Sequence, residues 1–271
     1  MTVPGTRALA SVATALLAAT LLTACGSSEV PEGADPDLVD AAEVPEAGVC
    51  RNLEGQALTA ATDATPHVEC DEPHNSETYA AGTLPEQFHD LSVASPDLDQ
   101  WAYQTCTREL RRHLGADEST VMRSVFSWVW YRPSERAWKD GARWYRCDAV
   151  AGGPQTSALM DLPTVTGQLL AKKGEDRWMA CAQGDSFDAA KAIPCSQDHD
   201  WRAVTTIKLG EPDAPYPGDN QAQVTTRDFC SDSVDAWLSY PGDFDFGYTW
   251  FGESEWEAGN RRSICWAQTE K

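Results

Sequence analysis

The sequence predicts an α+β protein made of two tandem disulfide-stapled modules, each an antiparallel sheet with one helix on a face, approximately ββαββ. Repeated cysteine intervals, repeated motif residues and a repeated order of helix and strand patterns predict this class. Eight cysteines follow Cys25 in two sets, with intervals of 20, 36 and 41 residues in the first and 14, 35 and 35 in the second. The sets are Cys50, Cys70, Cys106 and Cys147, then Cys181, Cys195, Cys230 and Cys265.

Residues around the cysteines repeat as well. In each set the second cysteine is followed four positions later by a histidine, His74 or His199. Each fourth cysteine ends a W-x-x-G-x-R-x-x-x-C pattern. Identities at these fixed offsets indicate an internal duplication. The pattern residues are Trp138, Gly141 and Arg143 in the first copy and Trp256, Gly259 and Arg261 in the second.

Each copy begins with strands and continues into a helix that carries its third cysteine. Residues 48–53 and 68–84 have the composition of two strands. In the helix that follows, Ser95 can cap, Pro96 suits the first position and Gly115 can end it. The apolar stripes are Leu98, Ala102, Cys106, Leu110 and Leu114 in the first copy, and Cys230, Val234, Trp237 and Leu238 in the second.

A strand with alternating aromatic residues follows each helix. A turn, over 132–135 or 252–255, then leads to a returning strand with the fourth cysteine. Residues 164–170 form a possible linking strand of the second copy. The alternating residues are Phe126, Trp128 and Trp130, then Phe244, Phe246, Tyr248 and Trp250.

Dividing eight cysteines between two modules reduces 105 possible disulfide connectivities to nine. We expect the first cysteine of each set to pair with the second, closing a hairpin, and the third with the fourth, joining helix to sheet. The expected pairs are Cys50–Cys70, Cys106–Cys147, Cys181–Cys195 and Cys230–Cys265.

The N-terminus has the layout of a secretory signal. Arg7 precedes an apolar run over 8–22, which is too short to span a bilayer as a helix. The sequence Leu22-Thr23-Ala24-Cys25 resembles the lipobox of bacterial lipoproteins, which implies lipidation at Cys25 and attachment to the extracytoplasmic face of the cell membrane. A plain cleaved signal and an uncleaved anchor are the alternatives.

Residues 26–46 contain seven acidic residues and neither Lys nor Arg, so we expect an extended tether. The expected organisation is a signal peptide over 1–24, an acidic Pro-containing tether over 25–46, module 1 over 47–152, a linker or linking strand over 153–174 and module 2 over 175–271.

The sequence Cys70-Asp71-Glu72-Pro73-His74-Asn75-Ser76-Glu77, together with the helix cysteine and the closing W-x-x-G-x-R pattern, resembles the septum-formation domain of actinobacterial envelope proteins. The resemblance covers both copies and implies an exported, non-enzymatic protein of septum formation or the cell envelope. The second copy departs from the pattern, because Asp198 precedes His199 where the first copy has Pro73, and Arg202 replaces Glu77.

The sequence contains no G-x-S-x-G, S-x-x-K or H-E-x-x-H motif, so we expect neither an enzyme nor a cofactor. The Cys-x-x-x-His spacing could suggest a metal half-site, but a disulfide sulfur is not a thiolate, so we expect no metal. His74 and Glu77 are instead expected to hydrogen-bond the turn or each other. A net charge of −21 argues against nucleic acid and anionic lipid as partners.

Tryptophans beside acidic residues allow a carbohydrate-binding face as an alternative to simple core packing. The matched positions of Trp138 and Trp256 favour the core. The leading hypothesis is therefore a lipid-anchored binding or scaffold protein of septum formation or envelope growth, with envelope or division proteins or wall polymer as partners. A wall-glycan binder or a regulatory subunit of a wall enzyme is the alternative.

Overall fold

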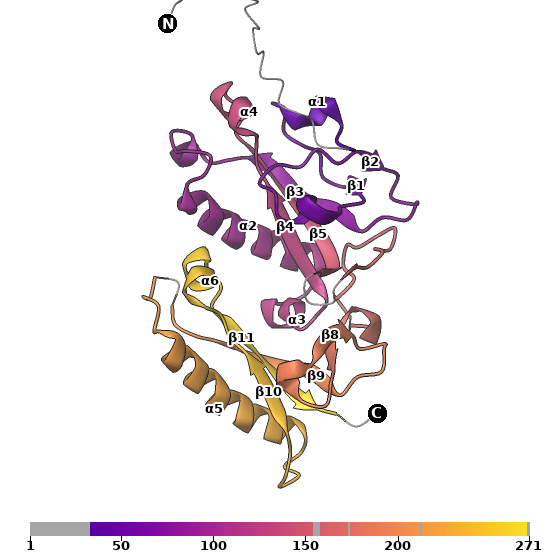
Figure 1. Cartoon of the computed structure of the whole chain (residues 1–271), viewed down its shortest axis with the longest axis vertical. Coiled ribbons are helices and arrows are strands. Elements are labelled where there is room, and N and C mark those ends of the chain that lie inside the picture. The colour runs from indigo at the N-terminus through magenta and orange to yellow at the C-terminus, as the bar shows by residue number, and fades with distance from the viewer. Residues whose placement is uncertain (1–32, 154–157, 173, 212, 270–271) are drawn as a thin grey trace, which may run out of the picture. The chain divides into compact units, whose positions relative to one another are not determined.

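Two antiparallel sheets form the framework of the protein (Figure 1). The computed structural model describes residues 33–153, 158–172, 174–211 and 213–269. The sheet of module 1 has the order β2-β1-β3-β5-β4, with β6 added to β5, and that of module 2 has the order β8-β7-β9-β11-β10. The strands are β1 Cys50–Arg51, β2 His67–Val68, β3 Ser76–Thr83, β4 Phe126–Tyr131, β5 Trp144–Gly153, β6 Ala158–Leu159, β7 Ala180–Gln183, β8 Lys191–Pro194, β9 Trp201–Lys208, β10 Phe246–Thr249 and β11 Arg262–Gln268.

The two strand orders are the same once β1 to β5 are matched with β7 to β11, which confirms the predicted class of two tandem α+β modules. One detail differs from the prediction, since three strands rather than two precede each long helix. The stretch 68–84 is not one strand, because β2 ends at Val68 and β3 begins at Ser76. Between them Pro73 lacks the N–H that a central strand needs, and a turn forms around the repeat histidine.

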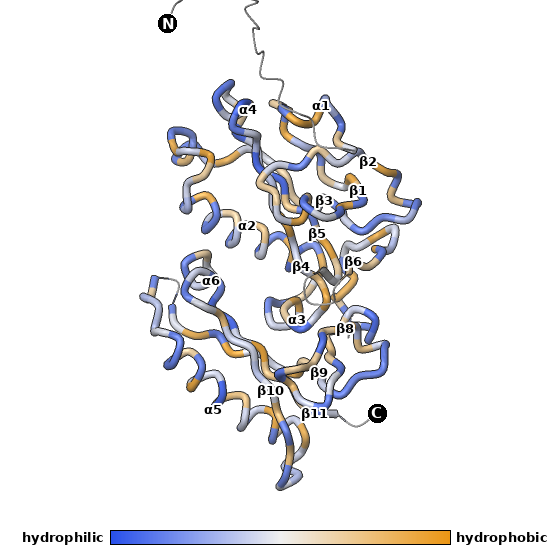
Figure 2. Tube along the Cα trace, in the orientation of Figure 1, coloured by the Kyte–Doolittle hydropathy of each residue, from blue (hydrophilic) through white to orange (hydrophobic). Residues whose placement is uncertain are grey.

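One long helix lies along each sheet, α2 (Pro96–Leu114) in module 1 and α5 (Asp219–Trp237) in module 2 (Figure 1). Figure 2 shows hydrophobic and hydrophilic residues alternating along both, as expected for helices with one buried face. All five predicted stripe residues of α2 are buried, and Gly115 ends α2 at a φ of 71°. The Ser95 side chain makes no cap hydrogen bond; its carbonyl accepts from the Leu98 N–H instead.

The stripe prediction for α5 is wrong at Trp237. Cys230 and Val234 are buried, but Trp237 is the last residue of the helix and is 48% exposed. The chain then turns away through Ser239 and Tyr240, both with positive φ. Trp237 therefore lies beyond the part of the sheet that α5 covers.

The two predicted turns before the returning strands are short helices, α4 (Glu135–Lys139) and α6 (Glu253–Ala258). Ser134 caps α4 by accepting a hydrogen bond from the Ala137 N–H at 3.0 Å. The remaining helices are α1 (Pro36–Val39) and α3 (Glu118–Met122), with 3-10 turns over Gly55–Leu58, Glu86–Phe88, Asp176–Trp178 and Phe187–Ala189.

Four disulfides staple the modules, and their pairs are those expected from the sequence. Cys50–Cys70 and Cys181–Cys195 join the first strand of each module to the end of the next. Cys106–Cys147 and Cys230–Cys265 join the long helix to the returning strand. Cys106, Cys147, Cys230 and Cys265 are all fully buried, so each staple lies in the core between helix and sheet.

The face of the first sheet opposite α2 is covered by residues on both sides of β1. Residues 33–46 therefore pack on module 1 and are not an extended tether, whereas the first part of the expected tether, residues 25–32, lies outside the described residues. The Asp35 N–H donates to the Ala64 carbonyl, and Trp144 Nε1 donates to the Ala41 carbonyl at 2.8 Å. Asp40 accepts a hydrogen bond from Ser134 at 2.5 Å. The low hydrophobicity of this segment does not keep it extended, because its backbone satisfies polar groups of module 1.

The same face of the sheet carries a buried ionic cluster of Arg51, Asp63, Arg146 and Asp148. Asp148 accepts from Thr78 Oγ1 at 2.7 Å and pairs with Arg146 at 2.9 Å. Arg146 also pairs with Asp63 at 2.5 Å, and Arg51 lies 3.9 Å from Asp148. Burial, and secondarily Arg146, lowers the pKa of Arg51 to about 10.

Module 2 has an apolar cluster on the corresponding face of its sheet. Trp266, which directly follows the fourth cysteine as Asp148 does, is buried together with Trp201. Phe187 packs on both indoles, with ring centroids 5.5 Å apart in each case. Ala203 stands where module 1 has Thr78. The same fold is thus stabilised by charges in one copy and by aromatic packing in the other.

Residues 158–172 belong to module 1, not to the second copy as residues 164–170 were expected to. β6 pairs with β5, and no strand occurs within the described part of the linker after Leu159. Leu162 and Leu170 are buried among apolar residues of module 1. This apolar burial holds the linker on its own module.

Direct contacts join the modules. The Val125 N–H donates to the Trp178 carbonyl, and the Ala180 N–H donates to the Arg123 carbonyl. Arg262 of β11 pairs with Glu118 of α3 at 3.0 Å. Helix α6 also packs on α2.

Cys25 and the predicted signal peptide lie outside the described residues. Among the helices that the structure describes, none combines the length and apolarity required to traverse a bilayer.

Replacing Asp148 with Ala should lower the free energy of unfolding by about 3–5 kcal/mol, because it leaves buried arginines without their shared carboxylate. Urea denaturation with the disulfides intact measures this. The control Glu109→Ala removes a surface pair with Arg112 and should cost less than about 1 kcal/mol. Equal losses for the two variants would contradict a structural role for the cluster.

Candidate functional site

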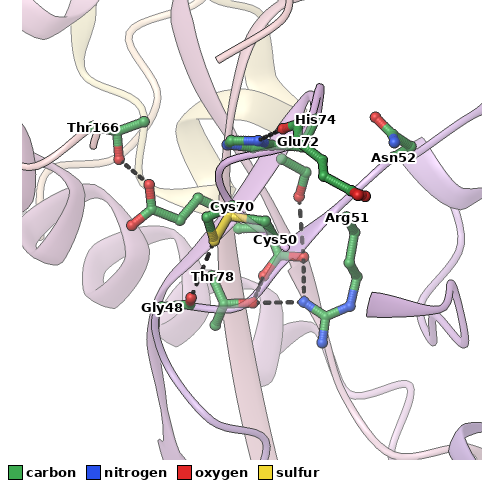
Figure 3. The surroundings of a disulfide bond; sticks show 12 residues. Gly48, Cys50, Arg51, Asn52, Cys70, Glu72, His74, Thr78 and Thr166 are labelled. Atoms are coloured by element: carbon green, nitrogen blue, oxygen red, sulfur yellow. Dashed lines mark hydrogen bonds and ion pairs between the residues drawn. A yellow bond between two sulfur atoms is a disulfide. The ribbon is translucent and has the colours of Figure 1, made fainter. Parts of the chain in front are cut away.

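The repeat histidines form the same turn in both modules. Figure 3 shows the turn of His74 in module 1. His74 Nδ1 lies 2.8 Å from the Glu72 carbonyl, and His199 Nδ1 lies 2.8 Å from the Gln197 carbonyl. Because a carbonyl can only accept, Nδ1 carries a proton in both rings. The prediction that His74 hydrogen-bonds the turn is therefore correct.

The surroundings of the two histidines differ. His74 is 1% exposed, and its carbonyl accepts a hydrogen bond from the Leu162 N–H of the linker at 2.8 Å. His199 is half-buried and lines two cavities. Equivalent turns are thus covered in module 1 and accessible in module 2.

His199 lies close to the disulfide of its module. A ring nitrogen of His199 and the sulfurs of Cys181 and Cys195 lie within 4.8 Å of one another. Both sulfurs are joined in a disulfide and supply no thiolate, so this group does not fit zinc.

The expectation for Glu77 is wrong, because its carboxylate contacts the linker and α2 and not the turn or His74. The Thr166 hydroxyl donates to Glu77 (Figure 3), and His113 Nε2 lies 2.6 Å from the same hydroxyl. Since Thr166 donates to Glu77, it accepts from His113, whose Nε2 carries the proton and is unable to act as a base toward Thr166. Thr166 is also fully buried. The group holds the linker against module 1.

The W-x-x-G-x-R pattern forms a clasp on each module. In module 1 the Arg143 guanidinium stacks 4.0 Å from the Trp138 ring and donates to the Trp138 carbonyl at 2.7 Å. Arg143 also donates twice to the His89 carbonyl, at 3.0 and 2.9 Å. Trp138 Nε1 donates to the Leu91 carbonyl. Indole and guanidinium together hold the connection between β3 and α2.

Module 2 repeats this clasp. The Arg261 guanidinium lies 3.7 Å from the Trp256 ring centroid and donates to the Trp256 carbonyl. Trp256 Nε1 donates to the Ala214 carbonyl, in the connection between β9 and α5. Trp138 and Trp256 are 7% and 3% exposed, which agrees with the core interpretation. Gly141 and Gly259 have φ of 101° and 114°, where glycine avoids strain.

Two cavities flank His199. The strand-end cavity, about 850 Å³, is lined by Asp198, His199, Asp243, Phe244, Asp245 and Thr269, among others. The junction cavity, about 1030 Å³, lies where residues of both modules meet. Its lining includes Arg123, Lys172, His199, Arg202, Trp237 and Thr269.

Comparison with known families accounts for the duplication. The septum-formation family model matches twice, over residues 22–132 and 122–265. The chain belongs to the septum-formation family. Comparisons with curated proteins and with solved structures gave no match.

Among the described residues of this septum-formation protein, the exposed large aromatic side chains are Trp237, Tyr240 and Trp250. Trp128 packs edge-on against Tyr103, with centroids 5.7 Å apart, and Arg132 stacks on Trp130. Trp250 is 41% exposed and Trp237 is 48% exposed. Sequence reasoning singled out neither Arg123 nor the Thr166–His113 contact, because these depend on where the linker and the second module pack.

Replacing Gly259 with Ala should destabilise the septum-formation protein more than Gly141→Ala, by about 1 kcal/mol or more. Both glycines have positive φ, but only at 259 would a new Cβ lie 2.9 Å from Tyr103, whereas nothing lies within 4 Å at 141. Thermal unfolding of the two variants measures the difference. Equal losses would show that the α6–α2 contact is loose.

Stability should fall as the pH drops below about 6.5, partly through His113. Burial lowers the pKa of His113, opposed by Glu77, so the unfolded chain binds this proton more readily than the folded one. The contribution is complete above the unfolded pKa and is lost as the pH falls toward the folded one. Urea unfolding at about pH 7.5 and about pH 5 should show a smaller loss for His113→Gln than for the wild type. An unchanged loss would exclude His113 as its source.

Proposed function

We propose that this septum-formation protein is a lipid-anchored, non-enzymatic binding or scaffold component on the extracytoplasmic face of the cell membrane, acting in septum formation or envelope growth. The family membership supports the role in septum formation or division. The observation that carries the binding role is the pair of cavities at His199, since the matching turn of module 1 is covered by its linker.

Three further features support the proposal. Eight of the nine cysteines form disulfides, so Cys25 is the cysteine that remains available for lipidation. Disulfides persist in oxidising compartments outside the cytoplasm. Thr166, His113 and Glu77 resemble a catalytic triad only in composition. Thr166 is buried and His113 Nε2 carries a proton, which favours a structural role for the three residues.

A wall-glycan binder is the second candidate. Trp237 and Trp250 favour it, because exposed indole rings can stack on the apolar face of a sugar. Uniform retention in the wall would support this alternative, whereas concentration at septa would support the leading proposal.

Replacing Cys25 with Ala should release the protein from the membrane fraction, because the acyl chains that hold it would have no attachment site. The control Ser27→Ala keeps the cysteine and should stay membrane-bound. An epitope-tagged wild-type protein should concentrate at division septa. Membrane retention of the Cys25→Ala protein would refute the lipid anchor, and a uniform distribution of the wild type would refute the septal role.

A further inference from the structure

In module 1 a groove is filled by the protein's own linker. Residues 158–172 pass from the end of β5, across the histidine turn, to the C-terminal end of α2. From Leu162 onward, three of their backbone N–H groups donate to carbonyls of the histidine turn and of the end of α2. These hydrogen bonds are Leu162 to His74, Gln168 to His113 and Leu170 to Leu114.

Module 2 has a counterpart for each wall of this groove. His199 corresponds to His74, and Trp237, seven residues after its helix cysteine, corresponds to His113. Strand register matches Phe244 with Phe126, because Tyr248 pairs with Cys265 as Trp130 pairs with Cys147. These counterparts line the two cavities, whereas Phe126 is buried with the linker residue Leu162.

The open groove retains features that suit a peptide backbone. The carbonyl of Trp237 lies at the end of α5, where helix carbonyls lack intrahelical partners. The residue four positions on is Pro241, which has no N–H to donate. In module 1 the matching carbonyl, that of His113, receives a linker N–H at 2.6 Å.

The charge of the groove differs between the copies. Arg202 occupies the position of Glu77, the carboxylate that accepts from Thr166. Arg123 lies in the same cavity, half-buried, with no salt bridge or side-chain hydrogen bond to any described residue. Burial lowers the pKa of Arg123; the nearby Asp117 carboxylate opposes this shift, and Arg202 adds to it. Two carboxylates also line this cavity: Asp176 pairs with Arg202 at 2.6 Å, so an incoming carboxylate would share or replace that pair, and Asp117 accepts from the Thr120 N–H and attracts Arg123.

We propose that module 2 binds an extended peptide segment of a partner protein in this groove, with an acidic side chain of the partner where Thr166 lies in module 1. Arg202 and Arg123 recognise the carboxylate. Trp237 packs against the segment, and the carbonyls at the helix end hold its backbone. The inference rests on the proposed binding function and specifies the chemistry of its ligand.

The probe is a synthetic peptide of residues 158–172 with Glu in place of Thr166, labelled with an uncharged dye. The same peptide with Lys at that position is its partner probe. Neither displaces the natural linker of module 1, which has the advantage of being tethered. Binding is measured by fluorescence anisotropy on the full exported chain with its disulfides intact.

The wild type should bind the Glu peptide at least about tenfold more tightly than the Lys peptide, and Arg202→Glu should reverse that order. Arg123→Gln should weaken binding of the Glu peptide without reversing the preference. Arg227→Glu is the matched control, a charge reversal on the exposed side of α5 that should leave both affinities unchanged. Thermal unfolding confirms that each variant is folded.

The absence of saturable binding of the Glu peptide to the wild type would overturn the proposal, as would an equal preference in wild type and Arg202→Glu. Saturable, Arg202-dependent binding of soluble wall saccharide without peptide binding would replace the peptide with a glycan. These outcomes are separate from the proposed function, which is tested by localisation and membrane retention of the same protein.

Discussion

The disulfide between the long helix and the returning strand is the constraint on which each module depends. Cys106–Cys147 and Cys230–Cys265 are fully buried and fix the helix on the sheet at its midpoint. On the chain-entropy model, closing a 41-residue loop contributes roughly 4 kcal/mol. The helix end that follows seven residues later is thereby held beside the histidine turn, and the space between them becomes the groove.

Around this shared frame the two copies have diverged in how they bury polar and apolar groups. Module 1 buries Asp148 and Arg146 on this face of its sheet, whereas module 2 places Trp266 at the position of Asp148. A buried ionic cluster and a close-packed aromatic cluster can therefore both fill a sheet face of this fold. The groove has diverged as well. In module 1 the linker covers the histidine turn and hydrogen-bonds to it, whereas in module 2 the histidine turn is accessible.

The architecture of the two modules could be predicted from sequence patterns. Cysteine intervals and the W-x-x-G-x-R motif gave the duplication, and the helix bounds at Pro96 and Gly115 followed from local backbone chemistry. Packing of residues 35–46 was not predicted, since composition describes the chain alone and not the carbonyls that Trp144 and other groups require. Arg123 could not be singled out for the same reason. It ends α3, and the local sequence does not indicate that residues of the second module pack around it.

The account rests on eight paired sulfurs, so disulfide mapping of the natively produced protein tests it most directly. Proteolysis without reduction, followed by mass spectrometry, should recover four linked peptides, Cys50 with Cys70, Cys106 with Cys147, Cys181 with Cys195 and Cys230 with Cys265. A peptide linking Cys50 to Cys147, or free thiols at most of these positions, would contradict it.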